Sequence, residues 1–218
     1  MTVAIEPARP LSRLLVAYGR KERRAVDRLL WAFDERLAAL ARTTTEPMIG
    51  QMRIAWWEEA LDDAEGIKGR GDPLVDALRA TGAMALPGLA AMLDGWEALL
   101  TMEEADEAML LRFARGRGGG LFAALARQEG EDVRAAGSLW ALWDLSGHVG
   151  DARTRAMAIA LAAPLARDAR AVAWPSGSRP LRIATALARH DVIRGRAAAP
   201  DLTPRLYGRL LRTAPFGI

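Results

Sequence analysis

The spacing of apolar residues between Arg20 and Arg42 is the feature that most limits the fold. These residues recur at intervals of three or four, which places them on one face of an amphipathic helix. The residues that carry the pattern are Val26, Leu29, Leu30, Phe33, Leu37 and Leu40. Alanine, leucine and arginine dominate the rest of the chain and β-branched residues are sparse, which favours helix nearly everywhere. We see no strand alternation and no repeat, so we expect an all-α fold with residues 1–218 in a single domain.

Glycine, proline and short polar runs predict where the helices break. A second helix is expected to begin near Glu46, with Pro47 in its first turn, and to end before "KGRGDP" at residues 68–73. Further helices are expected near residues 73–82, 86–101, 103–128, 132–147, 151–170, 179–191 and 203–213.

The run "RGRGGG" at residues 115–120 interrupts an otherwise helical pattern. Glycine-rich phosphate loops normally follow a strand, and no strand is expected here. The run therefore favours a kink or a close approach between helices. Arg115 and Arg117 beside it remain candidates for contact with an anion.

Composition excludes several classes of protein. The chain has 218 residues, of which 51% are hydrophobic, so a folded domain is expected. The absence of cysteine excludes disulfides and thiol chemistry. The chain has no apolar run of about 18 residues, and "MTVAIEPARPLSRLL" lacks the apolar core of a signal peptide. We therefore expect a cytoplasmic protein.

Positive charge is concentrated in residues 151–218, which hold 12 arginines and four aspartates, a net charge of +8. Such a basic end could bind an anionic membrane surface, a lipid or a diphosphate. Alternatively, the arginines reflect GC-rich codon usage, since Lys21 and Lys68 are the only lysines. A third alternative is that they pair with acidic residues of 1–150 inside the fold. Basic and aromatic residues are not interleaved, so we expect no nucleic-acid binding.

The segment "LLWAFDERLAALARTTTEPMIGQMRIAWWEEALDDA" resembles the N-terminal part of the squalene/phytoene synthase family. "RGRGGGLFAALA" and "ARAVAWP" also resemble segments of that family, and together the matches touch most of the chain, which looks short at its C-terminal end. The resemblance implies an isoprenoid-synthase-like helical bundle around a central cavity. It also implies that Gln51 and Arg53 face this cavity. With Arg115 and Arg117 they form our expected set of ligand-binding residues.

Active members of this family join two prenyl diphosphates, using Mg²⁺ held by two Asp-rich motifs on facing helices. Aligned on Ala32-Phe33 and Trp174-Pro175, the aspartates of these motifs fall on residues that are not acidic. These residues are Ala38, Ala39, Arg42, Ala162 and Ala166. Mg²⁺ needs hard oxygen ligands such as carboxylates, which alanine and arginine lack. The resemblance therefore implies the fold more strongly than the reaction.

Among the family, the chain looks most similar to the branch that lacks these motifs and includes the mitochondrial complex I assembly factor. This resemblance implies a non-catalytic protein without a cofactor, which binds an isoprenoid lipid or assists respiratory-complex assembly with a protein partner. It also suggests a location peripheral to the inner membrane. One alternative is an active prenyl transferase that condenses two prenyl diphosphates and uses Mg²⁺. Another is a helical scaffold with no ligand.

Four carboxylates, Glu58, Glu59, Asp62 and Asp63, could offer a different metal site. They form two i, i+4 pairs, but the pairs point about 100° apart around the helix. We therefore expect a solvated face with arginine partners. We expect the other prominent side chains to be structural: the Trp56-Trp57 pair packed on neighbouring helices, and His148 and His190 either structural or exposed. Further tryptophans are expected in the core, namely Trp31, Trp96, Trp140 and Trp143.

Overall fold

The computed structural model describes residues 5–44, 46–101 and 104–216, and side chains as far as residue 213. This part of the chain is helical and contains no β-strand, which confirms the expected all-α class. The elements are α1 (Pro10–Tyr18), α2 (Arg24–Thr43), α3 (Pro47–Asp62), α4 (Pro73–Ala80), η1 (Ala83–Ala85), α5 (Leu89–Leu100), α6 (Glu107–Phe113), η2 (Ala114–Gly119), α7 (Gly120–Ala126), α8 (Glu131–Ser146), α9 (Ala152–Asp168), α10 (Arg179–Val192) and α11 (Pro204–Phe216).

Several helices begin where the sequence supplies a capping side chain. The carboxylate of Asp72 accepts hydrogen bonds from the first free backbone N–H groups of α4. Asp106 and Asp151 do the same at the starts of α6 and α9, with contacts of 2.7 Å to the N–H groups of Met109 and Thr154. These bonds satisfy donors that have no partner inside the helix. The local sequence therefore fixes where these helices start.

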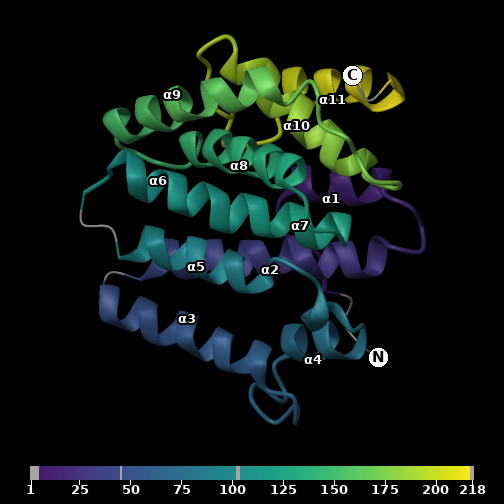
Figure 1. Ribbon diagram of the computed structural model, residues 1–218, viewed down its shortest axis with the longest axis vertical. Helices are drawn as coiled ribbons and strands as arrows, with labels where there is room; N and C mark the ends of the chain where they lie inside the picture. Colours follow the sequence, from purple (N-terminus) through teal and green to yellow (C-terminus); the bar gives the residue numbers. More distant parts are fainter. Residues whose placement is uncertain (1–4, 45, 102–103, 217–218) are drawn as a thin grey trace.

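The helices form successive layers along the long axis of the molecule (Figure 1). Helices α3 and α4 lie at one end, and α9, α10 and α11 lie at the other. Between these ends, α5 packs against α2, α3, α6 and η2, while α8 packs against η2, α7, α9 and α10. The helical run from α6 through η2 to α7 is thus held between α5 and α8.

The "RGRGGG" run forms η2, a π-helical segment that joins α6 to α7 without a break. Gly116 lies against Gly95 of α5, and Gly118 lies against Gly137 of α8. A Cβ atom on Gly118 would overlap the carbonyl oxygen of Gly137. The expected close approach between helices is therefore confirmed, since only glycine allows these backbones to lie so near each other.

Aromatic side chains fill much of the core. The four tryptophans expected there are all buried, which confirms that prediction. Trp57 is also buried, and its ring lies 4.9 Å from the ring of Phe33 on α2. No helix in the described part of the chain is both long enough and apolar enough to span a bilayer.

Helix α1 was not expected from the sequence. It is only nine residues long, so it offers little more than two turns of pattern. The usable signals were Pro10 at its first position and the spacing of Leu11, Leu14, Leu15 and Tyr18. Helix α1 packs against α2 and α10.

Candidate ligand-binding site

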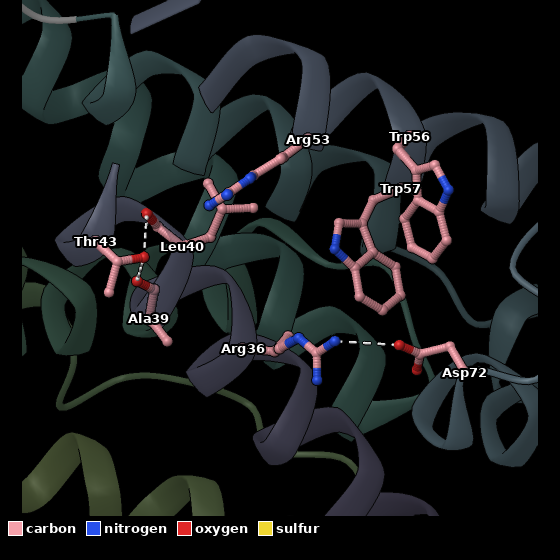
Figure 2. A pocket seen from close by; sticks show the side chains of 8 residues that line it. All are labelled: Arg36, Ala39, Leu40, Thr43, Arg53, Trp56, Trp57 and Asp72. Carbon is pink, nitrogen blue, oxygen red and sulfur yellow. Dashed lines mark hydrogen bonds and ion pairs between the residues drawn. The ribbon is translucent and has the colours of Figure 1, made fainter. Parts of the chain in front are cut away.

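A hollow of about 450 Å³ lies between α2 and α3, and we call it the α2–α3 hollow (Figure 2). Its volume falls within the range of about 300–1,000 Å³ that is usual for small-molecule sites. Helix α2 contributes four of its lining residues, α3 contributes three, and the residue before α4 completes it. These residues are Arg36, Ala39, Leu40, Thr43, Arg53, Trp56, Trp57 and Asp72.

The walls of the hollow are largely apolar. Leu40 and Trp57 are buried beneath it, and Trp56 is half-buried. The two indole rings meet edge to face at 5.1 Å. Ala39 adds a methyl group at a position where the family resemblance implies an aspartate. The apolar half of the lining is thus formed by Ala39, Leu40, Trp56 and Trp57.

Two cations stand at the edge of the α2–α3 hollow. Arg36 is held by Asp72, with Nη2 and Oδ2 3.1 Å apart. Arg53 extends from α3 toward Leu40 of α2 (Figure 2). Its Nη1 lies 3.5 Å from the hydroxyl of Thr44, and it makes no ion pair with a residue that the structure describes. Arg53 is therefore the cation that remains able to accept an anionic group.

The mapped aspartate positions do not meet across this hollow. Ala162 and Ala166 are fully buried on α9, which packs against α8. Helix α9 lies at the far end of the molecule from α3 (Figure 1). Within the described residues, no group of three His, Cys, Asp or Glu side chains is placed to hold a metal ion.

The four sequence-predicted ligand residues are not brought together. Arg53 lines the α2–α3 hollow, and its expected role in binding a ligand stays a prediction. Gln51 is exposed and is not among the lining residues, because it precedes Arg53 by two residues and so lies about 200° around the helix. Arg115 is exposed on η2. Arg117 is buried in the interior and lines neither this hollow nor the surface.

Arg117 belongs instead to a buried ionic network. Its Nε and Nη2 each lie 2.8 Å from one oxygen of Asp34, and Nη2 also lies 2.8 Å from Asp144. Only 2% of the Arg117 side chain is exposed. The guanidinium carbon lies 4.6 and 4.7 Å from the ring centres of Trp96 and Trp140. The expectation that Arg117 contacts a ligand is thus replaced by a role in holding helices together.

The charges in this network stabilise one another. Burial alone would lower the pKa of Arg117, but Asp34 and Asp144 outweigh it and the pKa is raised. Burial alone would likewise raise the pKa of Asp144, but the charges of Arg117 and Arg9 hold it well below its usual value. Arg9, the residue before α1, also pairs with Asp144, with Nη2 and Oδ1 2.7 Å apart. Arg9, Arg117 and Asp144 are therefore charged at neutral pH.

The partners of Arg117 were not predicted from the sequence. Asp34 follows the apolar run "LLWAF" and precedes Glu35, and Asp144 is the single carboxylate inside "LWALWDLSG". A charge on the buried face of a helix was the available signal, because such a group must be paired inside the fold. Which cation it meets depends on tertiary structure, and that information is not local.

The four carboxylates of α3 have mixed surroundings. Asp63 pairs with Arg79 at 3.4 Å, and Glu59 pairs with Lys68. Glu58 lies near Asp94 and Glu97, so the prediction of an arginine partner is wrong for this residue. The pKa of Glu58 is raised, mainly by partial burial and to a smaller extent by repulsion from these negative charges.

Several basic residues of 151–218 make contacts within their own part of the chain, whereas Arg155 donates to the carbonyl of Val149 and Arg179 lies over the ring of Tyr18. Arg209 pairs with Asp191 at 2.6 Å. Arg189 and Arg194 donate to backbone carbonyls of Ala166 and His190. In these contacts the arginines do not use the carboxylates of residues 1–150, as one alternative required.

Comparisons of this chain with protein-family models, with curated proteins and with solved structures gave no match.

Proposed function

We propose that this chain is a squalene/phytoene-synthase-like protein without catalytic activity, which binds an isoprenoid lipid in the α2–α3 hollow. The observation that carries the proposal is Ala39, which lines the hollow where the family resemblance implies a metal-binding aspartate. A methyl group cannot hold Mg²⁺, and without the metal a diphosphate leaving group is not neutralised. The hollow therefore supports binding without ionisation of the ligand.

The chemistry of the walls suggests how such a lipid would lie. A prenyl chain would contact Ala39, Leu40 and Trp57, and each square ångström of apolar surface removed from water contributes about 25 cal/mol. A phosphate or other anionic head would lie at the edge, beside Arg53. The planar guanidinium offers paired donors that match phosphate oxygens.

Binding of geranylgeranyl monophosphate and of geranylgeraniol, compared by calorimetry, tests this proposal. Arg53→Gln should weaken binding of the monophosphate by about 3- to 10-fold, the lower range that an exposed charge contact provides. The same variant should leave binding of the alcohol unchanged, because the alcohol carries no charge. Arg70→Gln is the matched control, since Arg70 is exposed and does not line the hollow.

A second variant tests the place of the hydrocarbon chain. Ala39→Trp fills the α2–α3 hollow and should abolish binding of both compounds. The proposal is contradicted if the unaltered protein binds neither compound. Equal effects of Arg53→Gln and Arg70→Gln would also contradict it, because Arg53 would then contribute no more to binding than an arginine outside the hollow.

An assembly role is the second candidate, and the exposed face of α3 favours it. Met48 and Met52 are 72% and 67% exposed, and Ile49 lies beside them. Exposed apolar patches of this kind mark binding surfaces, and methionine adapts to varied partners. If this face binds a partner in complex assembly, one identified protein should co-purify stoichiometrically with the chain. Replacing Met48 and Met52 by glutamate should release it without unfolding the chain.

Attachment to an anionic membrane, such as the inner membrane, is a separate proposal that the net charge of +8 supports. The basic helices α10 and α11 lie at the opposite end of the long axis from α3 (Figure 1). Attachment through those helices would not bring the α2–α3 hollow to the membrane surface. The basic end would therefore have a function separate from lipid binding in the α2–α3 hollow.

A further inference from the structure

A second hollow lies at this basic end, between the segment 169–174, which directly follows α9, and helix α10. We call it the α9–α10 hollow. Its volume is about 300 Å³. The described residues that line it include three arginines and no carboxylate. The lining residues include Arg170, Val172, Trp174, Arg182, Thr185 and Arg189.

Two of these arginines keep donors that the described fold does not use. Arg170 is exposed and makes no hydrogen bond or ion pair with a described residue. Arg189 is half-buried, and its Nε donates to the carbonyl of Ala166 at 3.0 Å. Its two Nη groups donate to no described residue. The guanidinium groups of Arg170 and Arg189 repel each other. The pKa of Arg189 is lowered, mainly by burial and to a smaller extent by the charge of Arg170. A bound anion would relieve this repulsion.

The hydroxyl of Thr185 is an independent sign of an unfilled site. Thr185 lines the hollow and is 4% exposed. Its Oγ1 is buried and has no hydrogen-bond partner among the described residues. A buried polar group without a partner destabilises a fold by about 1–3 kcal/mol, so such groups are rare unless something else satisfies them. A ligand oxygen in the hollow would do so.

We propose that the α9–α10 hollow binds a phosphate group, held by Arg170 and Arg189 and by the hydroxyl of Thr185. A phosphate monoester carries a charge of about −1.5 to −2 near neutral pH, which matches two adjacent guanidinium groups. Its several acceptor oxygens can take both arginine donors and a hydroxyl. The side chains of Trp174 and Val172 supply an apolar wall for the carbon that carries the phosphate. This site is separate from the α2–α3 hollow and does not depend on the isoprenoid proposal.

Two sources offer this chemistry, a free diphosphate and the headgroup of a phosphate-monoester lipid. Calorimetric titration of the full chain with inorganic pyrophosphate tests the first source. Flotation with phosphatidylcholine vesicles that contain phosphatidic acid tests the second. Binding in at least one arm is expected at about 0.05 M salt, where charges are little screened. Displacement of the chain from vesicles by pyrophosphate would show that both ligands use one site.

Three single variants locate the ligand. Arg170→Ala should weaken binding by about tenfold, as expected for loss of a charge-assisted hydrogen bond. Arg205→Ala is the matched control, because Arg205 is exposed in the same part of the chain and does not line the hollow. Thr185→Val keeps the shape of the side chain, removes the hydroxyl donor and should also weaken binding.

Some results would overturn the proposal. Absence of binding to both pyrophosphate and phosphatidic acid vesicles is one. An equal loss in Arg170→Ala and Arg205→Ala would show diffuse attraction to a basic surface. Unchanged binding in Thr185→Val would show that the anion binds outside the α9–α10 hollow and would contradict the proposal. Unchanged circular dichroism of the three variants confirms that each has folded.

Discussion

Arg117 and Asp34 form a bidentate ion pair in the interior, with two parallel contacts of 2.8 Å between residues that lie 83 positions apart. The pair joins η2 to α2, and Asp144 extends it to α8. Removing one partner from a buried ion pair leaves an unpaired charge in the interior. This loss destabilises the fold by more than the intact pair stabilises it. Loss of one partner of this contact should therefore destabilise the fold strongly.

Arg117→Met should lower the free energy of unfolding by about 3–5 kcal/mol, because it leaves Asp34 without its cation and Asp144 with Arg9 alone. Urea denaturation measures the change. Arg115→Met is the matched control, since Arg115 is exposed two residues earlier, and a change within about 0.5 kcal/mol is expected for it. Similar losses in the two variants would contradict the network described here.

The same network predicts a pH dependence of stability. Because Arg117 and Arg9 depress the pKa of Asp144 in the folded chain, its ionised form stabilises the fold above the unfolded pKa of about 3.9. That contribution is lost as the pH falls below about 4 toward the folded pKa. The stability difference between the unaltered chain and Asp144→Asn, measured in urea, should therefore shrink from about pH 6 to about pH 2. A difference that stays constant would show that Asp144 is not held in its charged form.

Two glycine substitutions should have effects of opposite sign. Gly118→Ala places a Cβ atom against the backbone of Gly137 and should destabilise the fold by about 1–3 kcal/mol or more. Gly208 lies within α11 with open space around it, so Gly208→Ala should stabilise by about 0.5–1 kcal/mol. Thermal unfolding monitored by circular dichroism measures both. A mild effect at Gly118 would mean that α8 and η2 are not in close contact.

Local pattern predicted much of the helical structure but not the contacts between helices. The apolar stripe around Phe33 and the proline at residue 47 each predicted a helix, because periodicity and capping act within a few residues. The pairing of Asp34 with Arg117 required knowing that η2 lies beside α2. From its glycine-rich run, Arg117 was predicted to contact an anion. Its burial follows from the close helix approach that those glycines permit.

The α2–α3 hollow itself was not predicted, because the resemblance implied a central cavity. The resemblance placed both Gln51 and Arg53 in a cavity, but helical geometry allows only one of them on the face that carries Trp56 and Trp57. The α9–α10 hollow was not predicted, because Arg170 and Arg189 are 19 residues apart and meet only through the return of the chain into α10. The sequence indicated a basic region without showing where its charges converge.

The chain should not condense farnesyl or geranylgeranyl diphosphate in the presence of Mg²⁺. The mapped positions Ala39, Ala162 and Ala166 cannot hold the metal, and α9 does not face the α2–α3 hollow. Incubation with labelled diphosphate and Mg²⁺, followed by product extraction, measures this. Product above a heat-killed control that disappears on addition of a chelator would support the alternative of an active prenyl transferase.

Photolabelling tests most directly the claim that the α2–α3 hollow holds an isoprenoid lipid. A geranylgeranyl monophosphate with a diazirine on its hydrocarbon chain is bound to the full protein and irradiated, and the labelled peptides are mapped by mass spectrometry. The account predicts labels on α2 and α3, within residues 36–57, which excess unlabelled compound suppresses and which Ala39→Trp abolishes. Labels concentrated on residues 169–189, or labels that neither competition nor Ala39→Trp reduces, would contradict it.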